Sequence, residues 1–355
     1  MKGKSIKIID SIVFVLIFVM LVSACSLATD KPIVIKYSDS DPPGGMRTVF
    51  VKDVWFPEII KQTNGRVKIQ DFWGSALLGP PEALKGVKDG VTDIAMIFAD
   101  FYPKQLAIYQ TFKLFPRSPA KWENIAWIYH KAFEEIPEFQ AELEAWNQKL
   151  LFVTVGLPSA FAATYPIKSI DDLKRKKWRA SSIWHLKDLE RLDVIPVSVP
   201  WVDVYMALST GTIDGVLTNY DGLHMMKFYE AAPNLLLAPG LWWATPFLHT
   251  INLDKWNSLP PDVQEGILKA SKIAEEKFSE TFKEAFNNTV AEEKKAGCTI
   301  TFMSEEDVKI FADEDFFKGL RNIWIKDAKE QGIKDAAYYI NRLKLIIEEG
   351  IKKEE

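Results

Sequence analysis

Hydrophobic and polar residues alternate along the chain in two rhythms, one typical of strands and one typical of helices. The first clear strand has Ile33, Ile35 and Tyr37 at alternate positions and ends in the polar turn 38–45. Similar strand patterns occur at 66–72, 92–98, 150–155, 177–180, 195–199 and 213–218, and helical patterns at 50–61, 81–89, 122–133, 137–147, 185–192 and 202–209. This alternation predicts an α/β fold with helices on both faces of its sheets.

One helical pattern is much longer than the others and runs from Pro261 to about Ala296. Apolar residues recur on one side of it from Val263 to Val290. A helix of this length spans about 50 Å, which exceeds the width of an ordinary domain. Because 355 residues suit two domains, we expect the helix to cross both. Ser304, followed by three acidic residues, predicts the start of the next helix.

The first 25 residues have the layout of a targeting segment. Three lysines precede the apolar run 12–22, which is too short to span a bilayer comfortably, and Val-Ser-Ala-Cys closes the segment at Cys25. This ending resembles a bacterial lipobox, which implies that residues 1–24 are a signal peptide and that Cys25 carries a lipid anchor. The alternative is an anchor helix with an incidental cysteine.

Composition and charge exclude several classes of protein. Hydrophobic residues make up 48% of the chain and charged residues 26%, which suits a globular protein rather than a disordered or collagen-like one. The net charge of −4 gives no reason to expect a nucleic-acid partner. If Cys25 is lipidated, Cys298 is left as a lone thiol.

Motifs for catalysis or metal binding are missing from the sequence. The four histidines have no metal-ligand spacing, and there is no H-E-x-x-H, paired C-x-x-C, G-x-S-x-G or G-x-G-x-x-G motif. We therefore expect no cofactor, no metal and no enzyme activity, although a secreted enzyme with an inter-domain site stays an alternative. Clefts between two α/β domains commonly bind small molecules and close around them, which favours a solute-binding protein.

Several sequence blocks sharpen this interpretation. They are T-N-G-R-V-K-I at 63–69, L-K-G-V-K-D-G-V-T-D at 84–93, P-I-K-S-I-D-D-L-K at 166–174, K-W-R at 177–179 and V-Y-M-A-L-S-T-G-T-I-D-G at 204–215. In this order they resemble the solute-binding subunit of tripartite ATP-independent periplasmic (TRAP) transporters, the DctP-type family, from about residue 33 to residue 290.

The resemblance implies a two-domain Venus-flytrap fold joined by crossing strands and one long helix. The division expected is 33–156 plus about 245–284 for the first domain, and 157–244 plus about 285–340 for the second. It also implies a monomeric periplasmic receptor that delivers an organic acid to a membrane permease. A binding protein of an ABC importer or a sensor kinase is the alternative, which the sequence blocks disfavour.

The resemblance also points to ligand-binding residues. Arg179 corresponds to the family's carboxylate-binding arginine, a suitable choice because a guanidinium stays charged and binds carboxylates through two parallel hydrogen bonds; the alternative is a solvated basic face. Trp201 falls where the family often packs an aromatic on the ligand, although a core or helix-cap role is also open. Thr218 falls where many members have a hydrogen-bonding asparagine, for which Asn219 and Tyr220 could substitute.

One position departs from the sialic-acid-type members, which carry a second arginine where this chain has Ser159. A cleft with one cation disfavours dicarboxylates and sugar acids, whereas Phe98 and Trp243 offer aromatic surface. We therefore expect a monocarboxylate with an apolar or aromatic body. Asp39, together with Asp41, could orient a hydroxyl or amine of the ligand, although turns rich in aspartate are common without any such role.

Overall fold

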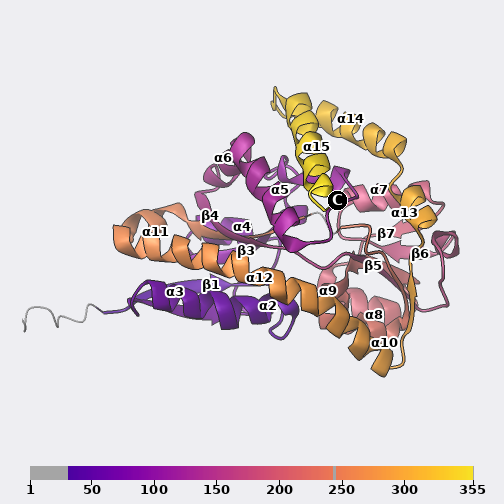
Figure 1. The fold of residues 1–355 in the computed structure, drawn as a ribbon, viewed down its shortest axis with the longest axis horizontal. Coiled ribbons are helices and arrows are strands. Elements are labelled where there is room, and N and C mark those ends of the chain that lie inside the picture. The colour runs from indigo at the N-terminus through magenta and orange to yellow at the C-terminus, as the bar shows by residue number, and fades with distance from the viewer. Residues whose placement is uncertain (1–30, 243–244, 355) are drawn as a thin grey trace, which may run out of the picture.

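The computed structural model describes residues 31–242 and 245–354. The predicted signal peptide, Cys25 and Trp243 lie outside the described residues. The chain forms two mixed sheets flanked by helices, which confirms the α/β class. In Figure 1 the first sheet lies to the left and the second to the right, and we call each sheet with its helices the first and the second half. The described residues include no helix long and apolar enough to cross a membrane.

The first sheet is built from early strands and one strand from much later in the chain. Its order is β2 (Val67–Phe72), β1 (Ile33–Ser38), β3 (Ile94–Phe98), β10 (Phe247–Asn252) and β4 (Gln148–Thr154). β1 pairs in parallel with β2 and β3, whereas β10 runs antiparallel between β3 and β4. The chain therefore returns to the first half after it has formed most of the second sheet, whose last strand is added later.

The helices of the first half include one segment that differs from its prediction. They are α2 (Met46–Phe50), η2 (Val51–Trp55), α3 (Phe56–Gln62), α4 (Ala83–Lys88), η3 (Ala99–Phe101), η4 (Tyr109–Leu114), α5 (Trp122–Glu135), α6 (Glu138–Glu144) and α11 (Leu253–Ser258). The helix expected at 50–61 contains the π-helical turn η2. Pro57 lacks an N–H group and therefore interrupts the regular hydrogen-bond pattern at the start of α3.

The second sheet contains six strands in the order β11 (Thr299–Phe302), β9 (Asn234–Leu237), β5 (Ser159–Ala163), β8 (Gly215–Asn219), β6 (Lys177–Arg179) and β7 (Ile195–Val197). Its helical elements are η5 (Ile170–Leu173), α7 (Ile183–Arg191), η6 (Trp201–Asp203), α8 (Val204–Ser209), α9 (Tyr220–Met225), α10 (Phe228–Ala231) and α13 (Glu305–Phe311). Ser304 caps α13 as predicted, because its hydroxyl accepts a hydrogen bond from the Asp307 N–H. Arg179 at the end of β6 and Thr218 and Asn219 at the end of β8 belong to the candidate functional site described below.

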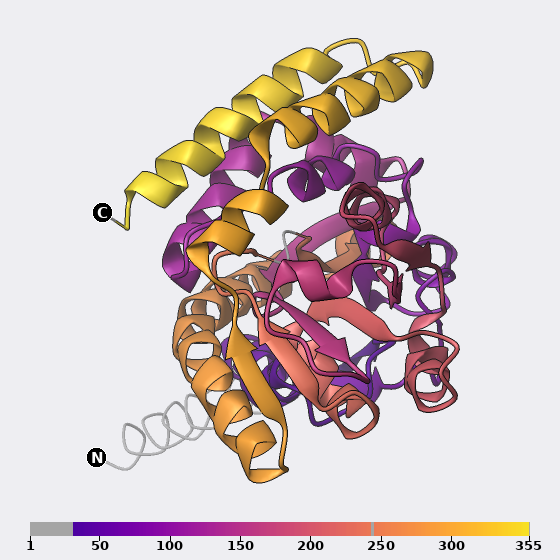
Figure 2. The same ribbon diagram turned by 90° about the vertical axis from the view of Figure 1, so that its right-hand side faces the viewer.

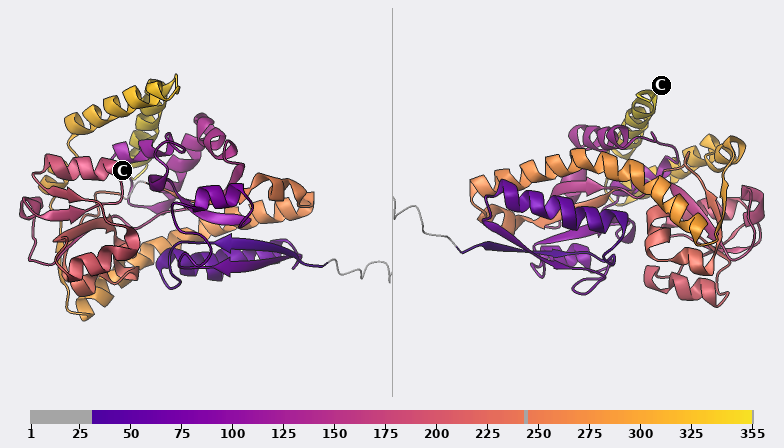
Figure 3. Two further views of the ribbon diagram at one scale, coloured as in Figure 1. Left: turned by 180° about the vertical axis from the view of Figure 1, so that it is seen from behind. Right: turned by 60° about the horizontal axis from the view of Figure 1, so that its bottom comes forward.

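The long helix α12 (Pro261–Lys295) joins the two halves, as its length predicts. It packs on α3, α5 and β4 in the first half and on α9 and β11 in the second. The two views of Figure 3 show it running along both halves.

The division expected from the sequence places residues up to about 340 in the second domain. The last two helices lie elsewhere, against the first half. α14 (Glu314–Glu330) and α15 (Ala336–Lys352) lie side by side (Figure 2) and pack on η4 and α5 of the first half. The indole N–H of Trp324 donates to the carbonyl of Ala107, and Arg321 donates to the carbonyl of Leu114. Both helices therefore pack on the first half.

Candidate functional site

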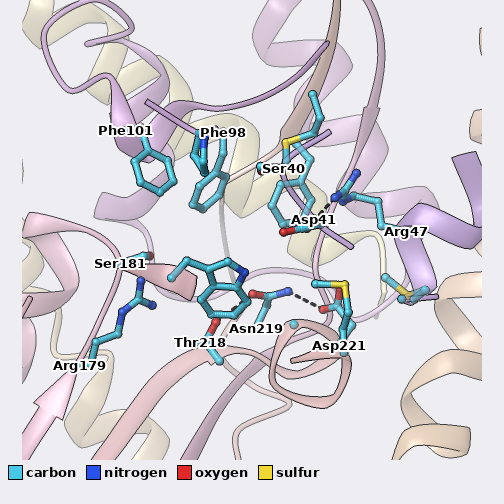
Figure 4. A pocket seen from close by; sticks show the side chains of 18 residues that line it. Ser40, Asp41, Arg47, Phe98, Phe101, Arg179, Ser181, Thr218, Asn219 and Asp221 are labelled. Atoms are coloured by element: carbon cyan, nitrogen blue, oxygen red, sulfur yellow. Dashed lines mark hydrogen bonds and ion pairs between the residues drawn. The ribbon is translucent and has the colours of Figure 1, made fainter. Parts of the chain in front are cut away.

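A cleft lies between the two halves and is lined by residues from both. It encloses about 630 Å³ not filled by protein atoms, part of it open to solvent. Six residues expected from the sequence line it, namely Asp41, Phe98, Arg179, Trp201, Thr218 and Asn219. Figure 4 shows Phe98 and Phe101 of the first half facing the polar side chains of the second.

Arg179 is the last residue of β6, and its guanidinium is buried in the cleft wall. The residue is 3% exposed. Its Nε donates to the carbonyl of Val199 at 3.1 Å, but its Nη1 has no hydrogen-bond partner among the described residues. Burial lowers the pKa of Arg179 to about 10, and the charge of Asp100 only partly opposes this. A buried donor without an acceptor is costly, so this atom is suited to bind an anionic group.

Trp201 lies beside Arg179 and reaches across the cleft. Its ring centroid is 5.4 Å from the Arg179 guanidinium, within the range of a cation–π contact. The indole also lies near the carboxylate of Asp41 in the first half, where it opposes the rise that burial causes in the pKa of Asp41. Trp201 packs edge-on against Phe228 at 4.9 Å. The indole is therefore part of the cleft wall, near residues of both halves.

The first half contributes a second arginine that the sequence analysis missed. Arg47, in α2, donates to Asp39 at 2.5 and 2.9 Å and to Asp41 at 2.6 Å. Burial opposes ionisation of Asp39, but the Arg47 guanidinium outweighs it and lowers the pKa of Asp39. Arg47 also lies over the Phe247 ring at 5.1 Å. Its charge is matched by two carboxylates, in contrast to that of Arg179.

The carboxylate of Asp39 lies behind Arg47 and does not line the cleft. The Tyr37 hydroxyl donates to Asp39 at 2.7 Å and lies 3.2 Å from Nδ1 of His249. Burial and the charge of Arg47 lower the pKa of His249 to about 3, so the imidazole is neutral. Asp39 therefore anchors Arg47, and the carboxylate that reaches the cleft from this turn is that of Asp41.

Hydrogen-bonded polar side chains lie at the end of β8 and the start of α9. The Thr218 hydroxyl donates to Oδ1 of Asn219 at 3.1 Å, and the Asn219 amide donates to Oδ1 of Asp221 at 2.8 Å. The backbone N–H of Leu157 donates to the same Asp221 oxygen at 2.7 Å. Burial raises the pKa of Asp221 to about 6. Asp221 lines the cleft and was not singled out from the sequence.

Two other expected residues point away from the cleft. Tyr220 is fully buried, and its hydroxyl donates to Glu293 of α12 at 2.6 Å. Ser159 is buried in β5, where its hydroxyl donates to the carbonyl of Trp242 at 3.3 Å. Neither residue lines the cleft. The hydroxyl of each already donates a hydrogen bond within the protein.

Further contacts join the halves beside the cleft. The Ser181 hydroxyl donates to Asp100 of the first half at 3.1 Å. Gly45 lies so close to Met225 that a Cβ atom at Gly45 would be 2.5 Å from the Met225 sulfur. Within residues 31–242 and 245–354 no group of three or more His, Cys, Asp or Glu side chains could hold a metal ion.

Two α/β halves, crossing strands, a long connecting helix and a lined cleft together define a two-domain solute-binding protein. The chain belongs to the family of bacterial extracellular solute-binding proteins, family 7 (DctP), whose family model matches residues 51–317. This confirms the resemblance to TRAP transporter subunits that the sequence blocks indicate.

Similar proteins of known name support the same assignment. The chain is 26% identical over 301 residues to the outer membrane transporter protein TsaT of Comamonas testosteroni, covering 82% of this chain and 85% of that protein. It is 25% identical over 284 residues to the C4-dicarboxylate-binding periplasmic protein DctP of Rhodobacter capsulatus, covering 77% and 80%.

Solved structures share the fold. A TRAP periplasmic solute-binding protein from Desulfovibrio salexigens is 25% identical with a TM-score of 0.73, covering 88% of this chain and 95% of that one. A TRAP solute-binding protein from Rhodoferax ferrireducens, in complex with copurified benzoate, is 20% identical with a TM-score of 0.79, covering 91% and 100%. These matches confirm the two-domain binding fold with its long helix.

Proposed function

We propose that this protein is the extracytoplasmic receptor of a TRAP transporter and binds a small monocarboxylate with an apolar or aromatic body. The carboxylate binds Arg179, and the loaded receptor delivers its ligand to the membrane permease. The observation that carries the proposal is the Nη1 atom of Arg179, which is buried in the cleft wall without a partner among the described residues. A carboxylate would satisfy it with a charge-assisted hydrogen bond.

The charge balance of the cleft supports a single carboxylate. Arg47 is already matched by Asp39 and Asp41, whereas Arg179 bonds only a backbone carbonyl in the contacts above. A second carboxylate on the ligand would therefore meet no unmatched arginine among the described cleft residues. It would also lie near Asp41 and Asp221, which line the same cleft.

The remaining cleft surface supports an apolar or aromatic body. Met96, Phe98, Phe101 and Phe247 come from the first half, and Trp201 comes from the second. Flat aromatic walls favour stacking with a planar ligand. The Rhodoferax protein was solved in complex with benzoate, and a marine metagenome protein of 24% identity was solved in complex with 3-hydroxybenzoate, so proteins of this fold can bind aromatic acids.

The first residues of the sequence support a proposal for where the protein is located in the cell. We propose that the signal peptide 1–24 directs export and that lipidated Cys25 anchors the receptor outside the cytoplasmic membrane. Intact-mass measurement of membrane-extracted protein tests this, because lipidation replaces residues 1–24 by acyl groups on Cys25. A mature protein that retains these residues would contradict it.

A thermal-shift screen tests the receptor proposal. Purified protein is heated with monocarboxylates, dicarboxylates, sugar acids, amino acids and polyamines. A ligand at one hundred times its dissociation constant stabilises a protein by about 2.7 kcal/mol, which raises the melting temperature by several degrees. We expect the shift with apolar or aromatic monocarboxylates. A shift confined to dicarboxylates or polyamines would contradict the proposal.

A further inference from the structure

Arg179 and Asp221 stand at opposite ends of the cleft. Arg179 ends β6, Asp221 lies in the first turn of α9, and Figure 4 shows Thr218 and Asn219 between them. All four residues line the same cleft. The second half therefore presents a cation at one end of the cleft and a carboxyl group at the other.

We propose that the cleft selects acids carrying a hydroxyl or N–H group distant from the carboxylate, and that Asp221 accepts a hydrogen bond from this group. The inference rests on the proposed function, because a carboxylate on Arg179 fixes the orientation of the ligand. It adds a specificity-determining residue and narrows the ligand class from monocarboxylates to those with a distal donor.

The hydrogen bonds of Asp221 leave it able to accept another. Two N–H groups donate to Oδ1 of this carboxylate, those of Leu157 and of the Asn219 side chain. An ionised carboxylate has about four acceptor positions, so about two are left for a ligand. No ion pair of Asp221 occurs among the described residues, and a further donor would offset the cost of burying its charge.

Asp41 is less suited to this role, although it also lines the cleft. Its carboxylate already forms an ion pair with Arg47, which donates a hydrogen bond to it at 2.6 Å. Arg47 in turn is held by Asp39 and Asp41. These groups are used within the protein, which leaves Asp221 as the acceptor for a ligand.

Arg179 provides the independent evidence that a ligand enters this space. Its Nη1 is buried and unpartnered, and it belongs to the same cleft lining as Asp221. One ligand that satisfies both ends needs an anionic group at one end and a donor at the other. A second carboxylate at the far end would instead be repelled by Asp221.

Matched pairs of acids test the inference in the full exported protein. Dissociation constants are measured calorimetrically at pH 8 for benzoate against 3-hydroxybenzoate and 3-aminobenzoate, and for phenylacetate against 3-hydroxyphenylacetate. We expect at least one donor-bearing acid to bind tenfold or more tightly than its parent. In Asp221→Asn this ratio falls at least fivefold.

Asp203→Asn is the matched control, because Asp203 is an exposed acid in η6 outside the cleft lining. It should leave the ratio unchanged. Equal binding within every pair, or a ratio that survives Asp221→Asn, would overturn the inference and leave the carboxylate receptor intact. Failure of all these acids to bind, together with a thermal shift only for ligands of another class, would overturn both proposals.

Discussion

The hydroxyl of Ser181 donates a hydrogen bond of 3.1 Å to the carboxylate of Asp100, and this bond joins the second half of the protein to the first. Asp100 also accepts from Thr245 at 2.8 Å and lies 3.4 Å from the Lys113 ammonium. Burial lowers the pKa of Lys113 to about 8, against the opposing effect of Asp100. The Asp100 carboxylate therefore contacts Thr245 and Lys113 in the first half and accepts a hydrogen bond from Ser181 in the second.

Removing the Ser181 hydroxyl should weaken closure of the cleft. We predict that Ser181→Ala binds ligand about fivefold more weakly, because one hydrogen bond contributes about 1 kcal/mol net. Calorimetry with the tightest acid of the screen measures this. Thr245→Val is the matched control: it removes a bond to the same carboxylate from just before β10, in the first half. The control should lower the melting temperature more than the affinity, and equal affinity losses in both variants would contradict the prediction.

The hydroxyl of Tyr220 should matter for stability rather than for ligand binding. It donates to Glu293, which is fully buried and also lies 3.2 Å from Nδ1 of His224. Tyr220→Phe leaves Glu293 short of one donor, so we predict a loss of about 1–3 kcal/mol in the free energy of unfolding. Denaturant unfolding measures this loss. Ligand affinity should stay within twofold, and a tenfold weaker affinity in a stable variant would return Tyr220 to the binding site.

Glu142 should make stability fall as the pH rises. Burial raises the pKa of this α6 side chain to about 8, and its Oε2 has no partner among the described residues. Between about pH 4.5 and 8 the unfolded chain has lost this proton and the folded protein keeps it. The free energy of unfolding therefore decreases with pH, by at most about 1.4 kcal/mol per pH unit from this group.

Glu142→Gln should remove this part of the slope. Urea unfolding of wild type and variant at several pH values between 5 and 8 measures the difference. Glu144→Gln, on the exposed face of the same helix, is the control and should keep the wild-type slope. Parallel curves for wild type and Glu142→Gln would show that Glu142 ionises normally in the folded protein.

Local patterns predicted much of the fold because they act through neighbouring residues. Ser304 caps its helix through an N–H three residues later. The length of α12 alone required it to cross more than one domain.

Other features depend on contacts that no local pattern encodes. The apolar faces of α14 and α15 show that these helices are covered, but not by which half. Tyr220 follows two cleft residues, yet α9 begins there and turns its side chain toward α12. The Arg47–Asp39 pair is eight residues apart, and an arginine just after an aspartate-rich turn was the available signal for it.

The affinity for donor-bearing acids should depend on pH through Asp221. The pKa of this carboxyl is raised to about 6 by burial, while the charge of nearby Arg47 lowers it slightly. Below pH 6 the group is protonated and accepts hydrogen bonds less well. We predict that 3-hydroxybenzoate loses most of its advantage over benzoate between pH 8 and pH 5, as measured by calorimetry. A constant ratio across this range would contradict the prediction.

The central claim is that the ligand carboxylate binds Arg179. The most direct test compares the dissociation constant of the tightest acid for wild type, Arg179→Lys and Arg179→Ala. Arg117→Ala is the control, because Arg117 is a partly exposed arginine outside the cleft lining. Arg179→Ala should bind at least one hundredfold more weakly and Arg179→Lys should be intermediate, because lysine keeps the charge without the paired donors. The empty Arg179→Ala protein should unfold at the wild-type temperature or above, since it no longer buries an unpartnered guanidinium group. Wild-type affinity in a folded Arg179→Ala variant would contradict the account.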